Sequence, residues 1–203
     1  VSYVCRSIII MSDLFAEHKN RLTELISKYR DRVDFLTIRL EQAAETNIFL
    51  RQSKIETLSE SIALGGQVRA CYRGGWGFSA FDDLSNLVER IEEAIAAAKI
   101  VGDSETILAT VEPIQTICHV PLKGSDPRNI SLANKKALCD RYDQLLRGYN
   151  DCLTTTTVSY GDSSQRIILA TSEGSLIEQS WSDMEMRFSA TARKDEAIQT
   201  GRE

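Results

Sequence analysis

The chain has 203 residues, of which 42% are hydrophobic and 26% are charged, a composition typical of folded domains. Its length allows one large domain or two small ones. The net charge of −5 and the sequence pI of about 5.2 argue against direct binding of nucleic acid, because phosphate neutralisation needs a basic face and no dense lysine and arginine cluster occurs. No segment approaches the roughly 20 apolar residues that span a bilayer. We therefore expect a protein that binds neither nucleic acid nor a membrane.

The cysteine content indicates a reducing compartment. The chain has an odd number of cysteines and no CxxC pair, which suits the cytosol better than a secreted disulfide scaffold. We therefore expect a cytoplasmic protein. The cysteines are Cys5, Cys71, Cys118, Cys139 and Cys152.

The opening segment, residues 1–10, would make a poor signal peptide. Its apolar part is short, Arg6 interrupts it, and no small-residue cleavage site follows. Met11 comes directly after it. We expect translation to begin at Met11 and residues 1–10 to be an upstream extension; a short edge strand is the alternative.

The next part of the chain predicts a helix followed by strands. Ser12 and Asp13 are good N-caps, and apolar residues then recur at steps of three and four as far as Tyr29, the pattern of an amphipathic helix. From Val33 the period changes to two, which is typical of strands. The predicted strands form an antiparallel meander and cover residues 33–41, 46–51, 55–62, 67–73 and 76–81.

Two pairs of glycines punctuate these strands. Gly65-Gly66 is expected to separate two of them. Gly74-Gly75 is expected to form a two-residue hairpin turn, because glycine tolerates positive φ at both central positions.

A second helix is predicted between Asp83 and Gly102, so residues 12–102 form a helix–strands–helix unit. All three prolines lie in residues 103–130, which we expect to be an irregular connection. Residues 131–203 are predicted to form a third helix followed by antiparallel strands. The fold class is therefore α+β, with antiparallel sheets and helices packed on one face.

Ser131 is the expected cap of the third helix. Its predicted apolar stripe comprises Leu132, Cys139, Tyr142, Leu145, Leu146 and Tyr149. Turns are expected at Gly161-Asp162 and Glu173-Gly174, between strands at 154–160, 166–171, 175–181 and 184–192.

No catalytic or metal-binding set is evident in these residues. A helical HExxH motif needs two histidines on one face, but the chain has only His18 and His119, far apart in sequence. His18 shares the apolar stripe of the first helix and is expected to be a packed edge residue. Cys118 and His119 are adjacent, and their side chains would diverge in an extended segment. No GxGxxG or P-loop motif is present either.

Trp76 and Phe78 stand at alternate positions around Gly77 and so point to one face of their strand. Core packing beneath a helix is the favoured interpretation. The alternative is an apolar shelf beside a peptide groove.

Several segments together resemble the TldD/PmbA family of metallopeptidases, once called modulators of DNA gyrase. The run Asp34 to Glu41 resembles the family's opening strand, and Ile55-Glu56 its next hairpin. The signature-like segments are Gly65-Gly66-Gln67-Val68-Arg69-Ala70 and Gly75-Trp76-Gly77-Phe78-Ser79-Ala80, and a later turn is Thr171-Ser172-Glu173-Gly174. The similarity covers about residues 13–203.

This resemblance implies a cytosolic protease built from two related subunits, as a hetero- or homodimer, that degrades or processes unfolded peptides. The TldD-type subunit carries zinc in an HExxxH motif, and the PmbA (TldE) subunit lacks that motif. The Gly75 to Phe78 segment is closer to the TldD type. No HExxxH occurs in this chain, so we expect it to be the amino-terminal, non-catalytic portion, truncated before the catalytic region, inactive and without bound zinc.

The resemblance gives no catalytic or metal residue here. It does single out a structural motif that is a candidate for part of a peptide groove: Gly65, Gly66, Arg69, Gly74, Gly75, Trp76, Gly77 and Phe78. Unfolded peptide is expected to add as a strand to the sheet through main-chain hydrogen bonds. A PmbA/TldE-like partner subunit or a non-enzymatic peptide- or protein-interaction module is the alternative function.

Overall fold

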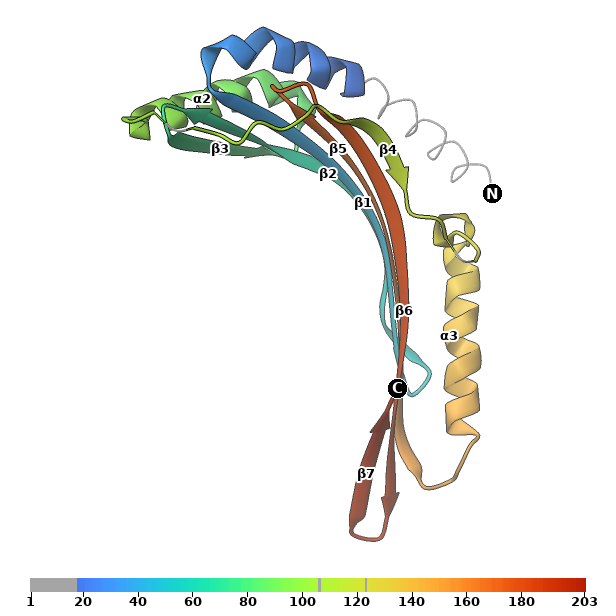
Figure 1. Ribbon diagram of the computed structural model, residues 1–203. Helices are drawn as coiled ribbons and strands as arrows, with labels where there is room; N and C mark the ends of the chain where they lie inside the picture. The colour runs from blue at the N-terminus through green and yellow to red at the C-terminus, as the bar shows by residue number, and fades with distance from the viewer. Residues whose placement is uncertain (1–17, 106, 123) are drawn as a thin grey trace. The chain divides into compact units, whose positions relative to one another are not determined.

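A computed structural model describes residues 18–105, 107–122 and 124–203. The predictions for residues 1–10 and for the caps Ser12 and Asp13 lie outside these residues. The described part is α+β with an antiparallel sheet, so the predicted fold class is confirmed (Figure 1). None of its helices is long and apolar enough to cross a membrane.

Seven strands form one hydrogen-bonded sheet in the order β3-β2-β1-β5-β6-β4, with β7 paired to β6. The helices are residues 18–29, α2 (Leu87–Val101) and α3 (Leu132–Arg147). Short 3-10 helices follow the first (Arg30–Arg32) and precede the other two (Leu84–Asn86 and Pro127–Asn129). The strands are β1 (Phe35–Arg51), β2 (Lys54–Tyr72), β3 (Gly75–Phe81), β4 (Gln115–His119), β5 (Leu153–Thr171), β6 (Leu176–Lys194) and β7 (Ala197–Arg202).

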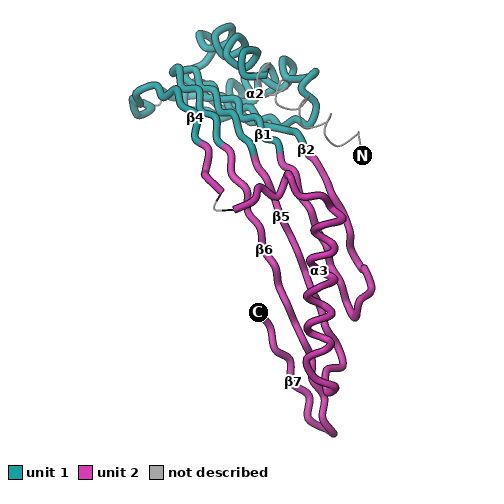
Figure 2. Tube along the Cα trace, turned by 90° about the vertical axis from the view of Figure 1, so that its right-hand side faces the viewer, with its two compact units in different colours: residues 1–42, 64–118, 166–179 teal, residues 43–63, 119–165, 180–203 magenta. Residues whose placement is uncertain are grey.

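The chain divides into two compact units, each assembled from several segments (Figure 2). Unit 1 comprises residues 1–42, 64–118 and 166–179, and unit 2 comprises residues 43–63, 119–165 and 180–203. The long strands β1, β2, β5 and β6 contribute residues to both units. Each unit is described separately below.

The strands are longer and fewer than the sequence predicted. The connection predicted before residue 46 does not interrupt β1, and Gly161-Asp162 lies inside β5 and forms no turn. Gly65-Gly66 does not break β2 either. A Cβ at Gly66 would lie 2.3 Å from the carbonyl oxygen of Arg39 and 2.5 Å from the ring of Phe81. Glycine is therefore needed there for close packing.

The hairpin between β2 and β3 is shifted by one residue from the prediction. Tyr72 pairs with Gly75, so the central residues of the turn are Arg73 and Gly74. Both have positive φ, 46° and 78°, which matches the right-handed twist of the flanking strands. Gly75 therefore belongs to β3. The predicted turn at Glu173-Gly174 is confirmed, with φ of 100° at Gly174.

The core of unit 1 lies between one face of its sheet and two helices, residues 18–29 and α2 (Figure 1). Alternate residues of the strands and every third or fourth residue of the helices point into it, as the two periodicities require. The most deeply buried members include Leu22, Leu36, Ile38, Leu40, Val68, Leu87, Ile91, Ile95 and Ile168.

An ion pair links Arg32, just after the first helix, to Glu92 on α2. The two guanidinium nitrogens of Arg32 donate to the two carboxylate oxygens of Glu92 at 2.6 and 2.7 Å. This hydrogen bonding lowers the pKa of Glu92. A carboxyl whose pKa is lowered in the fold stabilises that fold at neutral pH, and the contribution is lost as the pH falls through the folded pKa.

The close contact between β3 and α2 depends on glycine. Gly75 and Gly77 face the helix, and a Cβ at Gly77 would lie 1.9 Å from the carbonyl oxygen of Ala94 and 2.5 Å from the amide nitrogen of Ala98. No side chain fits in that space. Small residues on both elements therefore bring the helix backbone directly against the strand.

We expect Gly77→Ala to lower the free energy of unfolding of unit 1 by about 3 kcal/mol, because the added methyl group would overlap backbone atoms that cannot rotate away. Gly201→Ala is the matched control, since a Cβ there has no atom within 4 Å. Urea unfolding followed by circular dichroism measures both. Equal stability of the two variants would contradict this account of the contact.

Unit 2 has a smaller apolar core, in which α3 packs on one face of the unit's strands (Figure 2). Its buried members are Ile48, Leu50, Cys139, Val158 and Tyr160. The predicted apolar stripe of α3 is wrong in part. Tyr142, Leu145 and Tyr149 are exposed, whereas Lys135 and Asp143 are buried together with Cys139. The helix is rotated from the prediction because the strands beneath it offer polar partners.

Lys135 is the centre of one buried polar network. Its Nζ lies 2.7 Å from Oδ2 of Asp162 and donates to Oγ1 of Thr46 at 2.8 Å, and the two charged side chains are only 4% and 5% exposed. The Lys135 ammonium also lies 6.0 Å from the ring centre of Tyr160. Burial, followed by the neighbouring Asp162 carboxylate, raises the pKa of Tyr160.

Asp143 is the centre of a second network, two turns further along α3. Its carboxylate accepts hydrogen bonds from Thr156 at 2.8 Å and from Ser53 at 2.5 Å. Arg147 also donates to the hydroxyl of Ser53. Polar bonds therefore fix the rotation of α3 about its axis, because turning the helix would leave buried charges without partners.

We expect Lys135→Met to destabilise unit 2 by about 3–5 kcal/mol, because it leaves the Asp162 carboxylate buried without a counter-ion. Lys136→Met is the control, because the neighbouring Lys136 pairs with Asp140 at the surface. Loss of that exposed ion pair should lower the free energy of unfolding by less than about 1 kcal/mol. Thermal unfolding compares the two variants. The double variant Lys135→Met, Asp162→Leu should recover most of the stability, and a double variant as unstable as Lys135→Met would contradict the role of the ion pair.

Candidate functional site

The site is built on β3, whose residues alternate between two faces. Gly75, Gly77 and Phe81 are buried on the side of α2, and Trp76 and Phe78 point to the opposite side. Trp76 is 43% exposed and Phe78 is 58% exposed. Packing of Trp76 and Phe78 beneath a helix, the favoured interpretation of the sequence, is therefore wrong: the glycines occupy that face, and the aromatic rings are forced onto the other.

We call this second side the open face of unit 1, because both described helices of the unit pack on the other side. The rings of Phe35 on β1 and Trp76 meet edge to face, with centroids 6.0 Å apart and an interplanar angle of 63°. The guanidinium carbon of Arg69, on β2 between them, lies 4.9 Å from the centre of the Trp76 ring. Phe78 is the cross-strand neighbour of Arg69.

The open face continues across β1 and β5. Arg39 is half-buried on β1 and forms an ion pair with Glu41 at 2.6 Å. Thr37 lies between Phe35 and Arg39, and its hydroxyl is buried without a hydrogen-bond partner among the described residues. By strand alternation, Ile167 and Leu169 of β5 share this face. The surface is thus mainly apolar, with an exposed guanidinium near its aromatic end.

The structure separates the predicted motif into two roles. Arg69, Trp76 and Phe78 are brought together on the open face, where they are available to a ligand. The glycines Gly65, Gly66, Gly74, Gly75 and Gly77 serve close packing or the turn. Phe35 was missed by the sequence analysis, although its place in the alternating run after Val33 put it on the face opposite Leu36 and Ile38.

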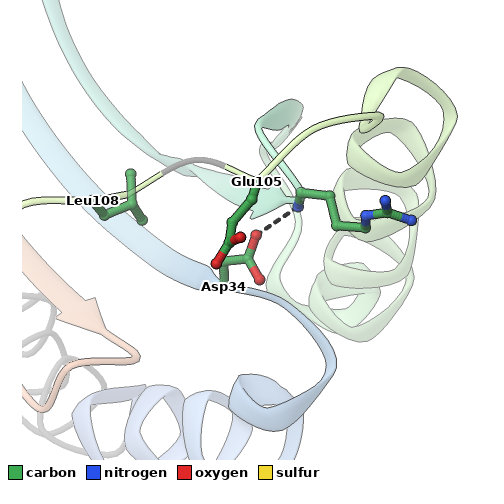
Figure 3. A pocket seen from close by; sticks show the side chains of 4 residues that line it. Asp34, Glu105 and Leu108 are labelled. Carbon is green, nitrogen blue, oxygen red and sulfur yellow. Dashed lines mark hydrogen bonds between the residues drawn. The ribbon is translucent and has the colours of Figure 1, made fainter.

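A separate hollow of about 600 Å³ lies beside the β2–β3 turn of unit 1. Figure 3 shows the carboxylates of Asp34 and Glu105 directed toward the same space, with Leu108 to one side. Asp34 accepts a hydrogen bond from the backbone N–H of Arg73 at 2.5 Å. Two carboxylates without a third donor group do not make a metal site.

The potential metal ligands do not converge anywhere in the described part of the chain. No group of three or more histidine, cysteine, aspartate or glutamate residues there is arranged to hold a metal. His18 is buried in unit 1, and His119 is exposed with its Nδ1 at 2.5 Å from the hydroxyl of Ser180. The neighbouring Cys118 is exposed and free. The described residues therefore do not fit a catalytic zinc ion.

Comparison with known protein families identifies the chain. Residues 37–99 match the family model for PmbA/TldA metallopeptidase domain 1, and residues 125–203 match that for the PmbA/TldA metallopeptidase central domain. Together the two models cover more than half of the chain. The chain belongs to the PmbA/TldD metallopeptidase family. The resemblance drawn from the sequence is thereby confirmed.

Curated relatives of this PmbA/TldD chain carry the name metalloprotease. Metalloprotease slr0863 of Synechocystis sp. is 57% identical over 91% of this chain and 40% of its own length. A metalloprotease of Methanothermobacter thermautotrophicus is 26% identical over 89% of this chain and 39% of its own length. The chain thus spans about 40% of the curated relatives that it matches.

Solved structures share the fold of this PmbA/TldD chain at low sequence identity. A Bacteroides thetaiotaomicron protein described as a modulator of DNA gyrase superposes with a TM-score of 0.72 at 16% identity, over 90% of this chain and 43% of that one. TldE from Thermococcus kodakarensis gives a TM-score of 0.69 at 16% identity, over 88% and 42%. At this identity the similarity supports the fold alone.

We expect the purified chain to bind no stoichiometric zinc after dialysis against micromolar zinc and removal of free metal, because the potential donor residues among those that the structure describes do not converge. Elemental analysis measures the metal content. One tightly held zinc per chain would contradict the assignment of this chain as a part without a metal site.

Proposed function

We propose that this chain is the non-catalytic, peptide-holding part of a PmbA/TldD-type zinc metallopeptidase that degrades or processes unfolded peptides. The metalloprotease names of its relatives and the chain's share of their length support this proposal. Zinc would be held by family residues that this chain does not contain, since an HExxxH motif needs two histidines five positions apart and the chain has only His18 and His119.

The observation that carries the proposal is the exposed aromatic end of the open face. Trp76 and Phe78 stay in solvent on a face that the described helices of unit 1 leave uncovered, and large exposed aromatic groups are typical anchors of protein and peptide ligands. A flat apolar shelf accepts many side chains, which suits substrates of varied sequence.

The edge of the sheet supplies a second means of binding. β3 ends the strand order, and its outer edge pairs with no other described strand. An unfolded peptide that adds to this edge would form main-chain hydrogen bonds, which are independent of sequence. Alternate side chains of that peptide would lie beside Trp76 and Phe78.

The alternative is a PmbA/TldE-like partner subunit or a non-enzymatic interaction module. The lack of converging metal ligands among the described residues is compatible with this alternative as well. The open face would then contact a partner subunit in a hetero- or homodimer. The coding sequence downstream of Glu203 discriminates the two, because an in-frame HExxxH supports the zinc peptidase and a longer region without it supports the partner subunit.

We expect the double variant Trp76→Ala, Phe78→Ala to bind an unfolded protein at least about ten-fold more weakly than the unaltered chain. The reason is that a few large aromatic side chains usually supply most of the binding free energy of an interface. Fluorescence anisotropy of fluorescein-labelled β-casein measures the affinity. Leu145→Ala, Tyr149→Ala is the matched control, since it removes exposed apolar side chains from α3 and from the turn just after it.

Hydrogen exchange with and without casein locates the contact. Added protection in β3 is expected if the peptide pairs with its edge. Casein binding that is unchanged in the Trp76, Phe78 variant, together with unchanged exchange in β3, would contradict the proposal.

A further inference from the structure

The open face of unit 1 carries a positive charge that its own residues leave uncompensated. Arg69 forms no ion pair or hydrogen bond in the described part of the chain, and its recorded contact is with the ring of Trp76. The other arginines of the unit's strands and α2 all have carboxylate partners: Arg39 pairs with Glu41, Arg90 with Glu93, and Arg166 with Glu178.

The position of Arg69 favours a carboxylate ligand. A guanidinium that lies over an aromatic ring is held in place by stacking and keeps its N–H edges free. Those edges match the two oxygens of a carboxylate, and charge-assisted pairs of this kind are the stronger hydrogen bonds. The stacked contact also reduces the side-chain entropy that binding would otherwise cost.

The surroundings of Arg69 favour an acidic side chain within a peptide over a chain terminus. Arg69 stands on β2 beside Trp76 and Phe78 of β3, and the ring of Phe35 on β1 meets the ring of Trp76. Both aromatic residues of β3 are largely open to solvent, so an extended chain can continue past the guanidinium. Residues two apart in such a chain lie roughly 7 Å from one another on the same side. An acidic residue on Arg69 therefore brings an apolar residue two positions away onto the aromatic rings.

We infer that the open face selects extended peptides in which an aspartate or glutamate side chain binds Arg69 while an apolar side chain two residues away packs on Trp76 or Phe78. This inference rests on the proposed function and defines its substrate class. The sheet edge remains independent of sequence, and Arg69 adds a preference for acidic-apolar segments.

Short unstructured peptides with acetylated and amidated ends test the preference. The first peptide alternates leucine with glycine and has a glutamate at its centre, two residues from a leucine. The second peptide has glutamine in place of that glutamate. The third is the glutamine peptide with a free carboxylate at its C-terminus. Fluorescence anisotropy measures binding to the full chain and to Arg69→Gln, Arg69→Lys and Arg30→Gln. Arg30→Gln is the charge-matched control, because Arg30 is exposed and pairs with its exposed neighbour Asp31.

We expect the glutamate peptide to bind about ten-fold more tightly than the glutamine peptide, a difference of about 1.4 kcal/mol. Arg69→Gln should abolish that preference, Arg69→Lys should retain part of it, and Arg30→Gln should leave it intact. The glutamine peptide with a free end should bind no better than its amidated form. Circular dichroism of each variant establishes that the fold is retained.

The outcomes separate this inference from the function on which it rests. Equal binding of the glutamate and glutamine peptides, both lost in Trp76→Ala, Phe78→Ala, overturns the role of Arg69 and leaves peptide holding in place. Preference for the free terminal carboxylate overturns the choice of an internal acidic residue. Loss of preference in Arg30→Gln as strong as in Arg69→Gln assigns it to net charge and overturns the inference. Absence of binding by every peptide and by casein overturns both proposals.

Discussion

The contact of β3 with α2 is the constraint on which the candidate site depends. The helix backbone lies so close to Gly75 and Gly77 that no Cβ fits between them, and Ala94 and Ala98 complete this contact from the helix side. Because neighbouring residues of a strand point to opposite faces, the large residues next to these glycines must project away from the core. The helix therefore places Trp76 and Phe78 in solvent although they are among the largest apolar residues of the chain.

The helices of the two units are held on the sheet by different kinds of interaction. Unit 1 uses an apolar core with aliphatic residues from two helices. Unit 2 has few buried apolar residues and holds α3 through Lys135 and Asp143, each with partners on the strands beneath. Buried charges contribute less net stability than apolar packing, but they tolerate only one arrangement because any other leaves a charge without a partner. Because Lys135 and Asp143 set the orientation of α3, the apolar side chain of Leu145 is left on the outward side of the helix.

The open face combines features that suit peptide binding without requiring a metal. Exposed aromatic groups supply apolar contact, the edge of β3 supplies backbone hydrogen bonding, and the stacked Arg69 supplies one charge. In the metallopeptidase proposed above, broad peptide affinity would come from the sheet, and hydrolysis would depend on metal ligands outside this chain.

The sequence by itself determined the α+β class, the caps at Ser131 and Gly102, the turn at Glu173-Gly174 and the family, because these depend on local periodicity, backbone preference and short motifs. It also placed Arg69, Trp76 and Phe78 in one motif. Tertiary structure alone decided which side of that motif faces solvent, because the glycines are required only where the backbone of α2 packs against them. Tertiary structure also decided that β1 and β5 continue without a break and how α3 is rotated about its axis. Local sequence patterns predict a turn at Asp162 and an exposed position at Lys135, but these two residues, distant in sequence, pair with each other in the core.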